Sequence, residues 1–150
     1  MSAIGVSCGR LTREGQLKPS YDPDADLLAV TSESDSDWPY GIDIDGNIVF
    51  DLNASRVLAN FDLHVAQRLW QKGATLDWPE GVPTGSLIFA EAALQQKSFS
   101  LPLRLPYDPD HGILRIEFGT MKASESLALS DSCVALLSNG YLVGFLIRHF

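Results

Sequence analysis

Residues 21–30 read YDPDADLLAV and residues 107–116 read YDPDHGILRI, so one opening occurs twice in a chain of 150 residues. Asp followed by Pro is favoured at the first two positions of a type I turn. The short apolar run that follows each turn is typical of a β-strand. The repeated pattern therefore predicts two copies of one small β unit.

Each copy also contains a two-residue turn signal between apolar runs. Asp45-Gly46 separates two such runs in the first copy, and Asn139-Gly140 does so in the second. A type I′ hairpin turn needs positive φ at both central residues, which Asp-Gly and Asn-Gly tolerate. Residues 113–118 alternate apolar and polar side chains, the period of a half-buried strand. Two related β-meander units are therefore predicted, at residues 21–55 and 107–149.

Residues 53–97, between the two units, change to a spacing of three and four between apolar positions. The positions that carry this spacing are Val57, Leu58, Phe61, Val65 and Leu69. They predict a helix that is capped by Asn53 and ends at Gly73. Residues 87–97 predict a second helix, with Ser86 as its cap.

Two further segments are expected to form strands. Residues 98–105 alternate apolar side chains, and Pro102 would place this strand at a sheet edge. Residues 3–17 favour a strand or a hairpin. The expected fold class is α+β, with two antiparallel β-meander units joined through one or two helices in a single domain of residues 1–150.

The composition suits one folded domain. With 45% hydrophobic residues, the chain has enough apolar material for one core. No apolar run approaches the roughly 18 residues that span a bilayer, and the start of the chain lacks a basic region before an apolar one. We therefore expect a cytoplasmic protein without membrane contact. Cys8 and Cys133 are expected to be reduced and packed as small apolar residues, with one disulfide as the alternative.

The net charge of −8 is concentrated in one block. Residues 21–62 hold ten acids and a single base, Arg56, which gives −9; the rest of the chain carries +1. The acids of the block are Asp22, Asp24, Asp26, Glu33, Asp35, Asp37, Asp43, Asp45, Asp51 and Asp62. Nucleic acid binding needs clustered Lys and Arg, so direct contact with nucleic acid is not expected.

The first copy resembles a small prokaryotic family of uncharacterised domains. Tyr21-Asp22-Pro23-x-x-Asp26-x-Leu28 resembles the family's YDPEADALYI-type opening strand. Residues 45–49 and Asn53-Ala54-Ser55 resemble its DxxGxIVGIEILxAS-type hairpin, although Phe50-Asp51-Leu52 replaces the longer GIEIL. The family has no established chemistry to carry over. Some members are encoded beside small toxin-like proteins, so the resemblance implies a binding or neutralising role.

Two motifs of known chemistry are weaker than they look. Residues 5–9 match G-x-S-x-G, but the nucleophile elbow around Ser7 would need a buried strand before it and a helix after it. Asp22, Asp24, Asp26 and Glu33 take the spacing of four EF-hand ligands, yet the sharp turn at the sixth position would fall on Leu27. These acids are expected to be turn-makers, with a calcium site as the alternative.

The three histidines do not form a recognisable site. His64, His111 and His149 lack the spacing of metal ligands, and a general base needs a positioned partner that the sequence does not reveal. Surface positions are expected for all three, with His64 on the first helix. No metal or cofactor is expected.

The favoured function is a non-enzymatic protein-binding module whose acidic face engages a basic partner, with a neutralising or regulatory role. The residues expected to bind the partner are Asp35, Asp37, Trp38, Tyr40 and Asp43. Aromatic anchors rimmed by charge are typical of interface hot spots, and complementary charge speeds encounter. For the two aromatic residues by themselves, a position covering an edge of the core is favoured over a binding patch, because aromatic side chains are mostly buried.

Three alternatives to this function stay open. The acids could serve only to keep an ordinary domain soluble. A small hydrolase would need two carboxylates buried together with shifted pKa values. A structural subunit would form a homodimer through an exposed strand edge.

Overall fold

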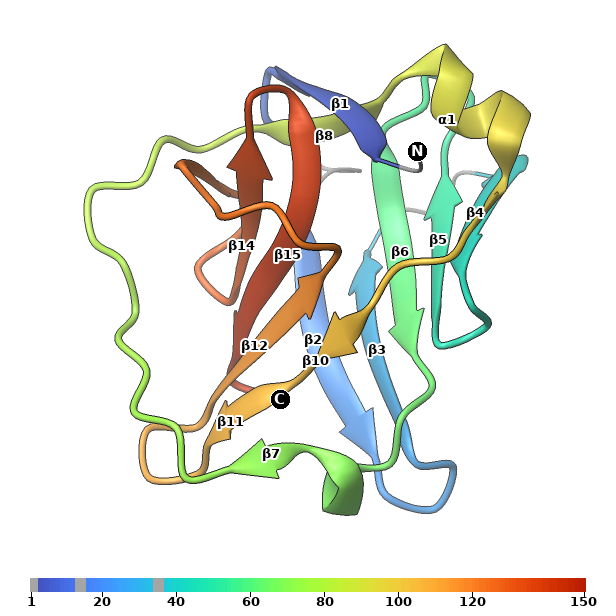
Figure 1. Cartoon of the computed structure of the whole chain (residues 1–150). Helices are drawn as coiled ribbons and strands as arrows, with labels where there is room; N and C mark the ends of the chain where they lie inside the picture. Colours follow the sequence, from blue (N-terminus) through green and yellow to red (C-terminus); the bar gives the residue numbers. More distant parts are fainter. Residues whose placement is uncertain (1–2, 13–15, 34–36) are drawn as a thin grey trace.

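The computed structural model describes residues 3–12, 16–33 and 37–150 and consists almost entirely of strands (Figure 1). The strands are, in chain order, β1 (Ile4–Gly9), β2 (Leu17–Asp22), β3 (Leu27–Ser32), β4 (Tyr40–Ile44), β5 (Ile48–Leu52), β6 (Leu58–Leu63), β7 (Gln71–Lys72), β8 (Ser86–Phe89), β9 (Ser98–Phe99), β10 (Leu103–Arg104), β11 (Pro106–Asp108), β12 (Ile113–Phe118), β13 (Glu125–Ala128), β14 (Cys133–Ser138) and β15 (Tyr141–Arg148). Within the described ranges the helices are short: α1 (Glu91–Gln96) and a 3-10 turn at Gln67–Leu69.

These strands form two sheets. The six-stranded sheet has the order β2-β3-β6-β5-β4-β9, and its first five strands come from the first half of the chain. The nine-stranded sheet has the path β13-β14-β15-β12-β11-β7, with β1, β8 and β10 attached beside it. The molecule is therefore mostly β rather than α+β.

One core joins the two sheets. Five phenylalanine side chains are fully or almost fully buried at its centre: Phe50, Phe61, Phe89, Phe118 and Phe145. The ring centroid of Phe50 lies 5.4 Å from that of Phe89 and 6.2 Å from that of Phe118. The rings of Phe61 and Phe145 stack with centroids 4.4 Å apart. Residues of both sheets thus share the same apolar contacts.

Both predicted hairpin turns are confirmed. Asp45 and Gly46 have φ of 52° and 73°, and Asn139 and Gly140 have φ of 49° and 82°. Positive φ at both central positions is the type I′ geometry that matches the twist of the flanking strands. The β4–β5 and β14–β15 hairpins follow from these turns.

The predicted helix over residues 53–72 is wrong. Residues 58–63 form β6, a strand that pairs with β3 on one edge and with β5 on the other. Asn53 does not cap a helix, because its Oδ1 accepts hydrogen bonds from the backbone N–H groups of Ser55 and Val57. The helical spacing was accidental: Phe61 and Leu63 face the core while Asp62 is half-buried, which is the alternation of a strand.

Two other expectations are confirmed only in part. The second helix was predicted at residues 87–97, but β8 takes its first residues and α1 begins after Ala90, so Ser86 is not its cap. The strand expected at residues 98–105 is split around Pro102: β9 pairs with β4, and β10 pairs with β12. This segment therefore crosses from one sheet to the other.

The amino-terminal strand is confirmed, but it does not form a hairpin. β1 pairs with β15 and β8, strands that are distant in sequence. Cys133 is buried as expected, whereas Cys8 on β1 is exposed and contradicts the expected packing.

The two YDPD stretches form hairpins of the same register. Tyr21 pairs with Leu28 across β2 and β3, and Tyr107 pairs with Leu114 across β11 and β12. The neighbouring strands differ, however. β12 pairs directly with β15, whereas β6 separates β3 from β5 in the other sheet.

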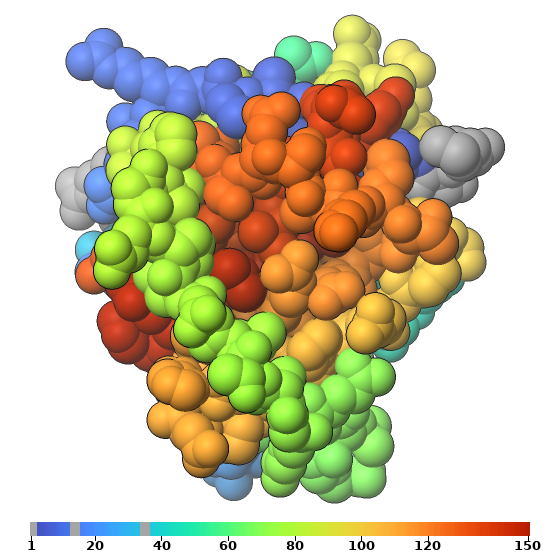
Figure 2. Space-filling model, turned by 60° about the vertical axis from the view of Figure 1, so that its left-hand side comes forward, coloured from blue at the N-terminus to red at the C-terminus, as the bar shows by residue number. Residues whose placement is uncertain are grey.

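The outer face of the nine-stranded sheet is partly covered by the 73–85 segment, drawn in green in Figure 2. Leu76, Trp78 and Val82 of this segment pack on a small second cluster of apolar side chains from β12, β14 and β15. The guanidinium of Arg148 lies 4.2 Å from the Trp78 ring centroid. In the part of the chain that the structure describes, no helix is long and apolar enough to cross a membrane.

Candidate functional site

The charge imbalance in the sequence becomes an imbalance between the two sheets. Residues 21–62, which carry the ten acids, run from the end of β2 to β6 and form most of the six-stranded sheet. The four adjacent strands β3, β6, β5 and β4 contain no Lys, Arg or His. Negative charge on this sheet is therefore not balanced by bases within its central strands.

Three carboxylates lie on the outer face of this sheet. Asp43, Asp51 and Asp62 are half-buried and alternate with buried apolar residues that face the core. Asp62 pairs with Val49, and Asp51 pairs with Asn60, so the two acids are diagonal neighbours on adjacent strands. Asp43 is also opposite Val49 and is diagonal to Asp51. Such diagonal positions are about 7–8 Å apart. We call these three carboxylates together with Asn60 the acidic sheet face.

Asp51 is the most constrained member of the acidic sheet face. Burial raises its pKa above the ordinary value of 3.8, and the nearby Asp62 carboxylate also raises it. The Nδ2 group of Asn60 donates a hydrogen bond of 2.8 Å to Asp51 Oδ2, which acts in the opposite direction. The charged form of Asp51 is therefore disfavoured in the isolated protein, and a nearby cation would favour it.

The predicted partner-binding residues do not gather at one place. Asp35 lies outside the described residues, and Asp37 is exposed. Asp43 belongs to the acidic sheet face, where its Oδ2 also accepts a hydrogen bond from Gly46 N–H. Tyr40 is 41% exposed and lines a different hollow, of about 690 Å³, between α1 and residues 54–56. Trp38 is half-buried, and its buried indole Nε1 has no hydrogen-bond partner among the described residues.

The other acids of the block that the structure describes serve mainly in turns. Asp22 Oδ1 accepts hydrogen bonds from the N–H groups of Asp24 and Ala25, so Asp22 is a turn-maker as expected. Asp45 Oδ2 accepts from Leu101 N–H, and Glu33 forms an exposed ion pair of 2.8 Å with Lys18. The part of the acidic block that lies on a sheet face is therefore small, and Asp51 and Asp62 were not among the predicted site residues. The alternation around Asp62 was the sequence signal that could have placed it there.

Two histidines have side-chain partners that the sequence did not reveal. His111 Nδ1 lies 2.6 Å from Asp108 Oδ2, and Asp108 is buried. The N–H of Leu76 donates to the same carboxylate, which is the main cause of the lowered pKa of Asp108. His149 Nδ1 lies 3.0 Å from Ser132 Oγ. The first pair closes the turn between β11 and β12 and ties the 73–85 segment to it.

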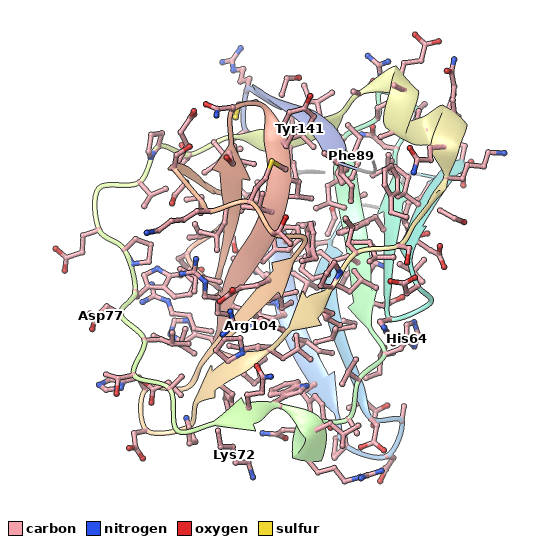
Figure 3. The ribbon with its side chains drawn as sticks, in the orientation of Figure 1. His64, Lys72, Asp77, Phe89, Arg104 and Tyr141 are labelled. Carbon is pink, nitrogen blue, oxygen red and sulfur yellow. The ribbon has the colours of Figure 1, made fainter. Side chains whose placement is uncertain are left out.

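The other histidine and the serine motif carry no comparable arrangement. His64 is exposed and follows β6, not a helix; Figure 3 labels its side chain near the β4–β5 hairpin. Ser7 lies within β1, opposite Ile88, so the sharp turn of a nucleophile elbow is missing. No group of three or more His, Cys, Asp or Glu side chains among the described residues is placed to hold a metal ion.

Comparison with known proteins adds no relative to this description. No protein-family model matches the chain, and no curated protein sequence matches it.

Proposed function

We propose that the chain is a non-enzymatic protein-binding module that engages a basic partner through the acidic sheet face. The observation that carries the proposal is the placement of Asp43, Asp51 and Asp62 on three adjacent strands that contain no base. A Lys- or Arg-rich surface laid across these strands would meet three carboxylates on a rigid sheet. Complementary charge of this kind speeds encounter and selects the partner.

The raised pKa of Asp51 supports the same proposal. Its pKa is raised chiefly by burial and also by the Asp62 carboxylate, so the charged form of Asp51 costs stability in the free protein. Functional sites often retain such unfavourable groups because binding compensates for them. A cationic partner would lower the pKa of Asp51, so binding would release protons. Affinity should therefore increase as the pH rises through the titration of Asp51.

The test uses an oligolysine peptide as a stand-in for the partner, with affinity measured by isothermal titration calorimetry at low and at physiological salt. The double variant Asp51→Asn and Asp62→Asn should weaken binding at neutral pH by about fivefold or more. The charge-matched control is Asp24→Asn with Asp110→Asn, two exposed turn residues on different hairpins. The control changes net charge equally but leaves the acidic sheet face intact.

Equal weakening by the two double variants would refute the proposal, because affinity would then depend only on net charge. The same conclusion would follow if the affinity of the unaltered protein did not increase from acidic to neutral pH. Thermal unfolding of every variant checks that the fold is retained.

We also infer an ancestry for this module, in which one hairpin unit was duplicated and then diverged. The shared register of the β2–β3 and β11–β12 hairpins supports this inference. The insertion of β6 beside β3 is the main divergence it requires. Relatives in which residues equivalent to 21–55 and 107–149 are more alike would support it, and chance-level similarity in all relatives would refute it.

A further inference from the structure

The outer face of the nine-stranded sheet has a hollow of opposite character to the acidic sheet face. Its volume is about 520 Å³, within the range of small-molecule sites. In Figure 2 this side of the molecule shows red atoms of the carboxy-terminal strands between the green 73–85 segment and the orange segments. The hollow itself is bounded by β10, β12 and residues 119–123, and its floor is formed by β14 and β15.

Three bases and one acid line this hollow. Arg104 on β10, labelled in Figure 3, stands directly opposite Glu117 on β12. Arg104 Nη1 lies 3.6 Å from Glu117 Oε2, and Arg115 Nε lies 3.1 Å from Glu117 Oε1. Lys122 also lines the hollow, so its net charge is +2.

The two arginines are incompletely matched by their shared acid. Arg115 Nε is buried and makes no hydrogen bond of good geometry within the described part of the chain, although Glu117 is close. Guanidinium groups favour planar, two-pronged contact with carboxylates, and one carboxylate cannot offer that contact to both Arg104 and Arg115. A second anion would supply the two-pronged contact that one carboxylate cannot give to both guanidinium groups.

The remaining lining of the hollow is mostly apolar. Leu136 and Val143 are almost fully buried members of the second apolar cluster, and Met121 and Ala123 pack against them. The two arginines come from β10 and β12, whereas Leu136 and Val143 come from β14 and β15. This division fits an elongated ligand with an anionic head and an apolar tail.

We propose that this hollow binds a small amphiphilic carboxylate, with the carboxylate at Arg104 and Arg115 and the apolar part against Met121, Leu136 and Val143. The site is independent of the acidic sheet face, because its lining comes from β10, β12, β14, β15 and the 119–123 segment. Glu117 competes with the ligand for both arginines. Its removal should therefore strengthen binding, a gain that a loss of structure could not produce.

The test is a titration of the full chain with octanoate, followed by amide NMR shifts of residues 117–123. Acetate supplies the head alone, octanol the tail alone, and inorganic phosphate an anion without a tail. Octanoate should bind about tenfold or more tightly than acetate, because apolar area is buried along with the charge. Arg115→Gln should weaken octanoate binding by about tenfold, and Glu117→Gln should tighten it by about two- to fivefold.

Arg148→Gln is the matched control, since Arg148 lies on the same sheet and stacks on Trp78 but does not line the hollow. It should leave octanoate affinity within about twofold of the unaltered protein. Octanoate shifts that map away from residues 117–123, equal affinities for octanoate and acetate, phosphate binding as tight as octanoate, or weaker binding by Glu117→Gln would each overturn the proposal.

Discussion

Phe50 is the side chain through which the two sheets are most directly joined. It is fully buried, and its ring contacts Phe61 of its own sheet, Phe89, and Phe118 and Phe145 of the other sheet, with centroids 5.4–6.2 Å apart. Phe50→Ala removes the whole ring from between the sheets. Because the surrounding strands are fixed by their hydrogen bonds, the space cannot close, and both transfer and cavity costs apply.

The expected loss in unfolding free energy is about 3–5 kcal/mol. At about 2–4 °C per kcal/mol for a chain of this size, the melting temperature should fall by about 6–20 °C. Phe150→Ala is the control: Phe150 is only half-buried, against Trp70 and Tyr107, and should cost about 1–1.5 kcal/mol.

Urea titration followed by amide NMR signals measures both the loss and its cooperativity. Signals from β5 and β14, one in each sheet, should disappear at the same urea concentration in the unaltered protein and in both variants. A loss below about 1.5 kcal/mol for Phe50→Ala would refute the shared core. Separate transitions for β5 and β14 would also refute it and would contradict the prediction of a single domain.

Three further predictions concern single residues. Gly144→Ala should lower the free energy of unfolding, measured by chemical denaturation, by about 1–3 kcal/mol or more. The reason is that a Cβ at Gly144 would stand 2.1 Å from the carbonyl oxygen of Ile116. Unchanged stability would contradict this close approach. The pKa of Asp51 is raised, so its ionisation destabilises the fold as the pH rises. The unfolding free energy of Asp51→Asn minus that of the unaltered protein should therefore be larger near pH 7 than near pH 3. A difference that does not change with pH would count against this. The pKa of Asp108 is lowered, chiefly by the hydrogen bond from Leu76 N–H, so its stabilisation is present above its ordinary pKa of 3.8 and is lost as the pH falls through the lowered value. Asp108→Asn should therefore lose less stability than the unaltered protein between about pH 5 and about pH 2, and parallel pH profiles would exclude this role for Asp108.

The sequence predicted the parts of the fold that depend on local geometry. Asp-Gly and Asn-Gly determined two hairpin turns because few other residue pairs accept positive φ twice, and the YDPD stretches predicted turns for a similarly local reason. The sequence did not predict β6, because this segment becomes a strand by pairing with both β3 and β5, and β3 is distant from it in sequence. Apolar residues at Val57, Phe61 and Val65 satisfied a helical period that tertiary pairing overrode.

The negative charge of the candidate site could be predicted from the sequence, but the residues that form the site could not. The excess of acids over residues 21–62 lies in the half of the chain that forms most of the six-stranded sheet. The acidic sheet face depends on the register of β4, β5 and β6. The helical spacing around Phe61 instead predicts a helix at Asp62. The basic hollow was missed because Arg104, Arg115 and Lys122 meet only once β10 pairs with β12.

The position of β1 has a consequence for how the chain is made in the cell. Ile4 and Gly5 pair with Leu142 and Tyr141, so β1 pairs with a strand that is far from it in the sequence. During synthesis the edge of β1 that pairs with β15 stays unpaired until Tyr141–Arg148 have emerged from the ribosome. The native sheet therefore cannot be completed before β15 is available, and nascent chains stalled before β15 should remain sensitive to proteases and dependent on chaperones.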